Sequence, residues 1–261
     1  MTDLSVPPSR VRHRVAPPAT AAPAGPPTSP RLRAWEERLA RMEARPDPLA
    51  GAARVLVVSA HPDDETLGAG RLIAGHVGPV VALTLTAGES CLAGRDVDIM
   101  DVGVLRLAEW RSALADLGAD TLDTPRWEDG TLAENEVDVA RLLLRTLLPG
   151  DVLLAPWSED PHADHRAAGR AAREAGEAAG VTVVEYPVWA PYLRTPHEVQ
   201  ETGHMLVPVE STAEASLAWR RAIGRYLSQL QPWHPGWAPL VPADLLRHHP
   251  IQLVAEESSH P

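Results

Sequence analysis

Two short stretches of the chain concentrate side chains that can bind a metal ion or move a proton. They are A-H-P-D-D-E at residues 60–65 and D-P-H-A-D-H at residues 160–165. Three consecutive acids beside a histidine place like charges within a few ångströms, which is costly unless a cation lies among them. His162 and His165 are three residues apart at an expected helix start, so they share one face, and imidazole is a common zinc ligand. Together the two stretches predict metal-assisted hydrolysis.

The residue types suit a catalytic zinc site, which commonly has three protein ligands and one position for water. His61, Asp64 and His165 would supply two nitrogens and one carboxylate, leaving Asp63 and His162 beside the metal. The metal lowers the pKa of its water, a carboxylate takes the proton, and a second acid–base group stabilises the oxyanion or protonates the leaving amine. The alternative for the first motif alone is a polar turn whose acids cap a helix N-terminus.

The elements that must position these motifs alternate along the chain. Apolar runs predict strands at residues 55–58, 79–86, 151–156 and 181–186, with a weaker strand at 120–123. Helical patterns predict helices at residues 66–76, 102–117, 136–148 and 162–179. Such alternation is typical of an α/β fold with a parallel sheet covered by helices on both faces. Ligands bind at the carboxyl ends of the strands in such sheets, where both motifs are expected.

The rest of the chain divides into segments of different composition. The expected organisation is a disordered Pro/Ala-rich tail at 1–30, a docking helix and linker at 31–50, a catalytic domain at 51–230 and a C-terminal cap or rim at 231–261. Within it we expect an edge strand at 203–208 and one long helix at 211–230. The tail holds 8 of the 26 prolines and few large apolar groups, so it cannot offset its ordering entropy.

The composition excludes several classes of function. All 24 basic side chains are Arg, and the absence of Lys excludes Schiff-base chemistry and the lysine-bearing phosphate loops. A net charge of −11 with 8 Trp and 3 Tyr argues against a nucleic-acid partner. The single Cys91 cannot form an internal disulfide, and no apolar run approaches the ~18 residues of a membrane span. We expect a bacterial, cytoplasmic protein without a membrane span.

The paired motifs resemble those of the PIG-L/LmbE-like N-deacetylases, which include the GlcNAc-phosphatidylinositol deacetylase and the mycothiol and bacillithiol pathway deacetylases. The resemblance runs from about residue 54 to about residue 231 and implies a Rossmann-like, mostly parallel sheet. It implies Zn²⁺, or another divalent ion such as Fe²⁺, held by His61, Asp64 and His165. It further implies Asp63 as general base, His162 as oxyanion stabiliser or general acid, and Asp164 as the group that orients and tunes His162.

Two weaker matches concern the substrate. Arg106, in R-x-x-E, and Asp129, in W-E-D-G, lie where the resemblance implies contacts to a sugar. The alternatives are an ordinary surface pair of Arg106 with Glu109 and an ordinary turn at Asp129. Asp160 lies where some relatives of the family carry a Tyr that helps the oxyanion, so the sequence departs from the family there.

The expected function is removal of an acetyl group from an N-acetylglucosamine-containing glycoside or small metabolite, so the expected partner is a small amino sugar. One alternative is an amidase that acts on a thiol conjugate or another amide. The other is a non-catalytic sugar- or nucleotide-binding module, although no G-x-G-x-x-G follows the first strand. The family resemblance also makes a homo-oligomer an expectation.

Overall fold

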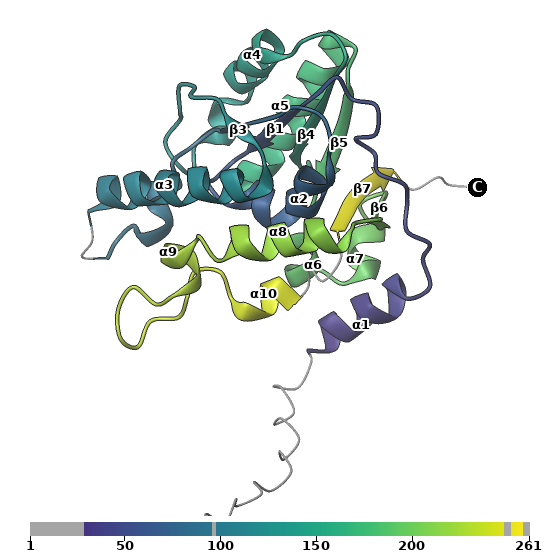
Figure 1. Cartoon of the computed structure of the whole chain (residues 1–261). Coiled ribbons are helices and arrows are strands. Elements are labelled where there is room, and N and C mark those ends of the chain that lie inside the picture. The colour runs from purple at the N-terminus through teal and green to yellow at the C-terminus, as the bar shows by residue number, and fades with distance from the viewer. Residues whose placement is uncertain (1–28, 96–97, 248–251, 258–261) are drawn as a thin grey trace, which may run out of the picture.

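A single seven-stranded sheet forms the centre of the molecule, in the order β3-β2-β1-β4-β5-β7-β6 (Figure 1). A computed structural model describes residues 29–95, 98–247 and 252–257, so the expected tail lies almost wholly outside the described residues. The strands are β1 (Arg54–Ser59), β2 (Val80–Thr84), β3 (Asp120–Thr121), β4 (Asp151–Pro156), β5 (Thr182–Tyr186), β6 (His204–Val209) and β7 (Gln252–Glu257). All pairs from β3 to β5 are parallel, whereas β7 is antiparallel to both its neighbours. The expected mostly parallel α/β sheet is confirmed.

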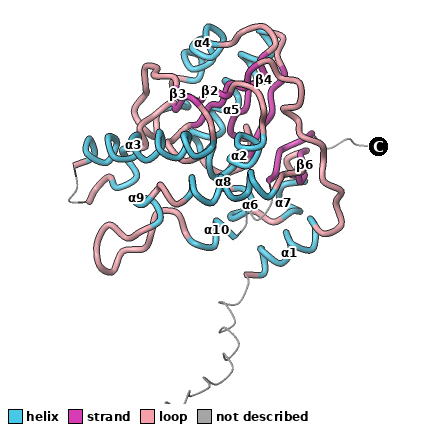
Figure 2. The backbone as a smooth tube through the Cα atoms, viewed as in Figure 1, coloured by secondary structure: helices cyan, strands magenta, loops and turns pink. Residues whose placement is uncertain are grey.

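Helices cover both faces of the sheet, as the smooth tube of Figure 2 also shows. One face carries α2 (Asp64–Gly75), α3 (Ile99–Leu117) and α8 (Ala213–Ile223), and the other carries α4 (Glu136–Thr146) and α5 (Ala163–Ala179). Successive side chains of a strand point to opposite faces. Val55 and Val57 of β1 accordingly join the first core, while Leu56 and Val58 join the second. A strand buried on both faces explains the continuous apolar run in the sequence.

The strand order creates a switch point beside β1. Its two neighbours are β2 and β4, and the helices that follow β1 and β4 lie on opposite faces of the sheet. The loops after these two strands therefore diverge and leave a crevice at their carboxyl ends, which is where open α/β sheets bind ligands. Both motifs follow these two strands, so the topology brings them side by side.

The chain after β5 differs from the sequence-based expectation. The single helix expected at 211–230 is two, because α8 ends at Ile223 and α9 (Leu227–Leu230) starts after a non-helical Tyr226 with φ −84° and ψ 59°. The N–H of Ser228 donates to the carboxylate of Glu109 at 2.8 Å, a tertiary contact that replaces a helical one. Tertiary contacts of this kind override local helix propensity.

The C-terminal segment also differs from the expected cap. It contains the short helix α10 (Ala243–Arg247), but residues 252–257 form β7, which lies inside the sheet between β5 and β6. The expected edge strand is present as β6, and within the described sheet it pairs with β7 through six residues. The sequence of the six residues in β7 gives no indication that they pair with β6, which lies about fifty residues earlier.

An N-terminal helix, α1 (Pro30–Leu39), packs against the chain that follows β5. Leu32 and Trp35 are buried, and the Trp35 indole N–H donates to the carbonyl oxygen of Arg194 at 2.8 Å. The neighbouring elements are α6 (Ala190–Leu193) and α7 (Pro196–Gln200), and the remaining short turns of helix are η1 (Glu89–Leu92) and η2 (Leu132–Glu134). None of the helices in the described part of the chain has both the length and the apolar character needed to cross a membrane.

Candidate metal centre and active-site pocket

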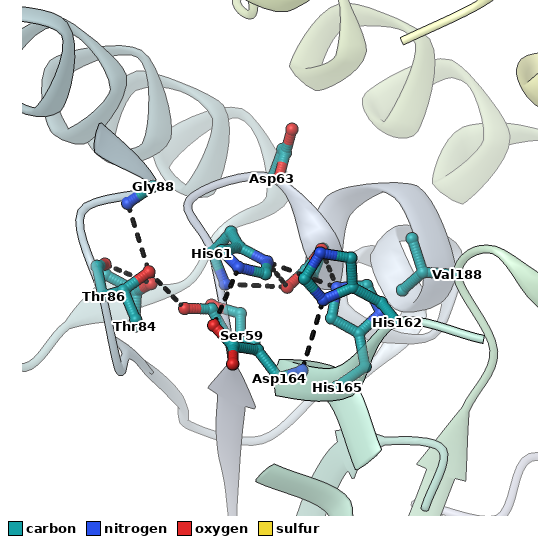
Figure 3. A network of polar contacts seen from close by, with 12 residues as sticks. Ser59, His61, Asp63, Thr84, Thr86, Gly88, His162, Asp164, His165 and Val188 are labelled. Carbon is teal, nitrogen blue, oxygen red and sulfur yellow. Dashed lines mark hydrogen bonds and ion pairs between the residues drawn. The ribbon is translucent and has the colours of Figure 1, made fainter. Parts of the chain in front are cut away.

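The two motif loops converge on one buried cluster, drawn in Figure 3. His61 follows β1, and its backbone N–H donates to Asp64 Oδ2 at 2.7 Å, which closes the turn into α2. Asp63 occupies the N-cap of that helix. His165 lies in the first turn of α5 and is fully buried. The acids thus do lie at a helix start, as the polar-turn alternative required, but Asp64 also faces His61 of its own loop and His165 from the helix that follows β4.

The three expected ligand side chains form a compact triangle, to which Asp64 contributes both of its carboxylate oxygens. His61 Nδ1 lies 3.3 Å from His165 Nε2 and 3.3 Å from Asp64 Oδ2, and His165 Nε2 lies 3.1 Å from Asp64 Oδ1. Tetrahedral zinc with bonds of about 2.0–2.1 Å needs ligand atoms about 3.3 Å apart. The three side chains therefore fit a small tetrahedral metal ion in donor type and in spacing.

Two other groupings of donors surround His61, namely His61 with His162 and His165, and His61 with Asp129 and Asp164. We favour the grouping with Asp64 for two reasons. His162 is exposed, unlike His165 and Asp64, and Asp129 and Asp164 face the other ring nitrogen of His61, Nε2, at 3.0 and 3.5 Å. Carboxylates that hold the far nitrogen of a metal-binding histidine are the usual arrangement around such a ligand.

Asp160 orients His165 from the opposite side. Its Oδ1 lies 3.1 Å from His165 Nδ1, and its Oδ2 accepts the backbone N–H groups of residues 188–190 at 3.0, 3.0 and 3.2 Å. Burial opposes ionisation of this carboxyl, but the contacts to His165 and to backbone N–H groups lower its pKa. An ionised Asp160 can only accept, so His165 carries its proton on Nδ1 and turns the Nε2 lone pair toward the triangle. The sequence analysis does not predict this orienting role of Asp160, although its place in the second motif is a signal for it.

The Asp164 carboxylate differs from the expectation that it would orient His162. It accepts the backbone N–H groups of Gly130 at 2.8 Å and Leu132 at 3.3 Å, besides facing His61. The contact to His162 comes from the backbone instead, because the N–H of Asp164 lies 3.3 Å from His162 Nδ1. Asp164 therefore ties the Asp129–Gly130 turn to the metal centre.

The electrostatic field of the cluster favours a cation. Burial opposes the charged form of His165, yet Asp64 and Asp160 outweigh it and raise its pKa to about 9. Burial likewise opposes a charge on His61, but Asp64, Asp129 and Asp164 raise its pKa well above the ordinary value. A place that holds protons this strongly on two buried imidazoles is negative enough to attract a metal ion, which would displace those protons.

Asp63 stands beside the triangle with Arg106 as its partner. Burial raises the pKa of Asp63 to about 6, although the Arg106 guanidinium, 3.1 Å from Oδ1, opposes the shift. Arg106 is itself buried and also donates to the carbonyl oxygen of Gly88 at 2.7 Å. Gly88 has a φ of +62°, and a Cβ there would clash with the guanidinium. The alternative interpretation of Arg106 and Glu109 as an ordinary surface pair is excluded, because both side chains are buried.

A cavity of about 300 Å³ opens onto these groups. Its lining contains the ionisable residues His61, Asp63, Asp64, Arg106, Asp129 and His162, and further Leu67, Ser90, Cys91, Gly130, Trp189, Gln229, Leu240 and Val241. All the predicted site residues except His165 and Asp164 thus line one cavity, and those two are buried. Four of the lining residues, Trp189, Gln229, Leu240 and Val241, come from segments after β5, which the motifs did not indicate.

A larger cavity of about 400 Å³ lies around Arg173, Glu185 and Glu257. None of the predicted site residues lines it. Size alone therefore does not identify the site. The convergence of buried ionisable groups with shifted pKa values does.

Comparison with known proteins agrees with this geometry. The model of the PIG-L family, GlcNAc-PI de-N-acetylase, matches residues 56–176, which include both motifs, and no curated protein matches the chain. Among solved structures, the antimicrobial reagent A40926 pseudoaglycone deacetylase Dbv21 is 23% identical, with a TM-score of 0.56 over 69% of this chain and 83% of that one. A triple mutant of the teicoplanin-pathway deacetylase Orf2 is 18% identical, with a TM-score of 0.56 over 80% of this chain and 100% of that one.

The same fold also carries a different reaction. GalB, the 4-carboxy-2-hydroxymuconate hydratase from Pseudomonas putida KT2440, is 18% identical, with a TM-score of 0.51 over 80% of this chain and 96% of that one. Likeness at this level shows the fold, and the reaction has to be argued from the site. The resemblance to the PIG-L family is thus confirmed by the match of its model to residues 56–176, the segment that carries both motifs.

Proposed function

We propose that the protein is a zinc-dependent N-deacetylase that acts on an N-acetylated amino sugar. The observation that carries the proposal is the triangle of His61, Asp64 and His165 atoms 3.1–3.3 Å apart, with Asp63 beside it at the wall of a cavity. A zinc ion held there would supply Lewis acidity, which activates water and polarises an amide carbonyl. Fe²⁺ or another divalent ion would suit the same donor types.

Asp63 is the proposed general base. A base works best when its pKa is close to the working pH, and burial brings that of Asp63 to about 6. The carboxylate is thus ionised at pH 7 and ready to take a proton. Arg106 holds one of its oxygens, so the carboxylate keeps one orientation.

His162 is the proposed oxyanion stabiliser. Although the side chain is exposed at the mouth of the cavity, partial desolvation of the ring and the neighbouring His165 and His61 lower its pKa to about 4, so the ring is neutral at pH 7. Its Nδ1 accepts the backbone N–H of Asp164, which places the ring proton on Nε2. A neutral imidazole that offers one N–H suits hydrogen bonding to an oxyanion better than it suits donating a proton to the amine.

The proposed substrate is an N-acetylglucosamine-containing glycoside or small metabolite. The cavity is at the lower end of the size range of small-molecule sites, which suits one sugar ring. Arg106 and Asp129 are the proposed sugar contacts because both line the cavity. Two of the compared structures are antibiotic-pathway deacetylases, which adds antibiotic scaffolds to the aglycones worth screening.

The test joins metal analysis to an amine-release screen over N-acetylglucosaminides. His61→Ala and His165→Ala should lose bound metal, whereas Asp63→Asn should keep the metal and lose about 10²–10⁴-fold in turnover. Asp138→Asn, an exposed carboxylate on α4, is the matched control and should change neither quantity. Near-wild-type turnover by Asp63→Asn would contradict the mechanism. Unchanged binding of a sugar with no amine release after verified metal loading would favour a non-catalytic module instead.

The same screen distinguishes an N-acetyl-sugar deacetylase from the remaining alternative, an amidase that acts on a thiol conjugate. Amides of thiol conjugates, presented beside the N-acetyl sugars, would release amine in the same assay. Faster release from these amides than from any N-acetyl sugar would replace the sugar substrate while retaining the metal and the base.

A further inference from the structure

A chain of hydrogen bonds runs from Glu109 of α3 through Ser228 to Gln229, a residue that lines the cavity. Glu109 accepts the backbone N–H of Ser228 at 2.8 Å and its hydroxyl at 2.5 Å. The Ser228 Oγ in turn receives the Nε2 of Gln229 at 2.9 Å. None of these contacts belongs to the metal centre, yet Gln229 lines the same cavity.

This chain determines which way the Gln229 amide points. The single hydroxyl proton of Ser228 is used on Glu109, so its oxygen can only accept from Gln229. The group that faces Ser228 is therefore the NH₂, and the carbonyl oxygen Oε1 faces away from it. The backbone of Gln229 is held as well, since its N–H donates to Tyr226 O at 3.0 Å and its carbonyl accepts from Val241 N at 2.9 Å.

The oriented carbonyl oxygen has no hydrogen-bond donor among the described residues. Gln229 is only 3% exposed. Its Oε1 is nevertheless not among the unpartnered side-chain atoms that lack accessible surface, so the oxygen keeps some surface, and the cavity is the space which that surface faces. The residues that line the cavity with it include the apolar Leu67, Leu240 and Val241, and a smaller pocket joins Gln229 to Asp63, whose carboxylate can only accept. An amide carbonyl fixed among groups that offer no donor selects a ligand that brings one, because a ligand without a donor leaves the oxygen unpaired.

We propose that Gln229 is a specificity-determining residue whose Oε1 accepts a hydrogen bond from a ring hydroxyl of the substrate. The inference rests on the proposed function of the same site and adds a second substrate contact, made by Gln229, to those proposed above. In this arrangement the metal centre binds the N-acetyl group, and Gln229 accepts a hydrogen bond from one hydroxyl of the sugar. Glu109 and Ser228 are positioning residues, since they act through the orientation of the amide.

The experiment compares a methyl N-acetylglucosaminide with its monodeoxy analogues, each of which lacks one ring hydroxyl. Gln229→Leu removes the amide and keeps the side-chain size, and it should lower kcat/KM on the parent glycoside about three- to tenfold. The wild type should lose a similar factor on one deoxy analogue, and Gln229→Leu should not distinguish that analogue from the parent. Gln231→Leu, two residues further along and exposed, is the matched control and should behave as the wild type.

Metal content and thermal unfolding are measured on every variant, so that a folding defect is recognised. If Gln229→Leu does not fold, Ser228→Ala keeps the glutamine but removes the hydroxyl that orients it, and it should lose part of the discrimination on the same analogue. Wild-type rates for Gln229→Leu, or an equal loss on every analogue, would overturn the role of Gln229 while leaving the deacetylase intact. No amine release from any N-acyl sugar by metal-loaded wild type would overturn the proposed function and this inference with it.

Discussion

Replacing Asp160 by Asn should weaken metal binding far more than it weakens the fold. The two oxygens of Asp160 have different partners: Oδ2 accepts three backbone N–H groups, and Oδ1 faces His165 Nδ1 and the N–H of His162. An Asn side chain has only one acceptor oxygen. If its NH₂ faced residues 188–190, three hydrogen bonds of about 1 kcal/mol each would be lost.

The other orientation is cheaper. With the NH₂ toward His165, the three backbone contacts survive and one bond to His162 is lost, which costs about 1 kcal/mol of folding free energy. His165 Nδ1 must then accept, so the ring proton moves to Nε2 and occupies the lone pair that the metal needs. Loss of such an orienting group typically lowers metal affinity about 10- to 100-fold. Asp160→Asn should therefore stay folded and lose metal.

The assay is a competition between the metal-stripped protein and a chelating dye, followed by urea unfolding of the same sample. Glu159→Gln removes a neighbouring carboxylate that no described hydrogen bond uses, so it controls for the change in charge. An unchanged metal affinity in Asp160→Asn, with Glu159→Gln also unchanged, would refute the assignment of His165 as a ligand oriented by Asp160.

Two further perturbations test other parts of the structure. Arg106→Leu removes the cation that lowers the pKa of Asp63, so that pKa should rise above its value in the wild type; since the base works ionised, the acid limb of the kcat/KM profile should move to higher pH with metal content unchanged. A limb at the same pH in both proteins would show that Arg106 does not act on Asp63. Trp35→Ala empties a buried site under α1 and should lower the free energy of unfolding by about 3–5 kcal/mol in urea titration, whereas the exposed Glu36→Ala should change it little. Equal midpoints for the two variants would show that α1 is not part of the cooperative unit.

The sequence was sufficient for the parts of the site that lie next to each other along the chain. Apolar runs and helix-stop glycines located β1, β4 and α5 because their periods are local, and each motif falls on the loop that such elements define. The fold then brings the loops together by a general rule of strand order. For that reason the sequence sufficed to propose His61, Asp64 and His165 as metal ligands, and the fold brings these three side chains together.

Contacts between distant segments could not be predicted in this way. The break before α9 depends on Glu109 drawing in Ser228, 119 residues away. β7 pairs with β5 and β6, two strands that lie much earlier in the sequence. Gln229 lacked any motif, and its role follows only from where the Glu109 contact places it. Asp160 belongs to the second motif, but the sequence only allowed a comparison with a tyrosine of the family. Its orienting role could not be predicted because the N–H groups that it binds belong to the distant residues 188–190.

The late position of β7 in the chain separates two stages of synthesis. The strands that carry both motif loops, together with β5, are complete by Tyr186, whereas Gln229, Val241 and β7 are added afterwards. During translation, the two motif loops thus leave the ribosome before Gln229 and Val241, so the cavity that both sets of residues line is complete only after the C-terminal segment has been added.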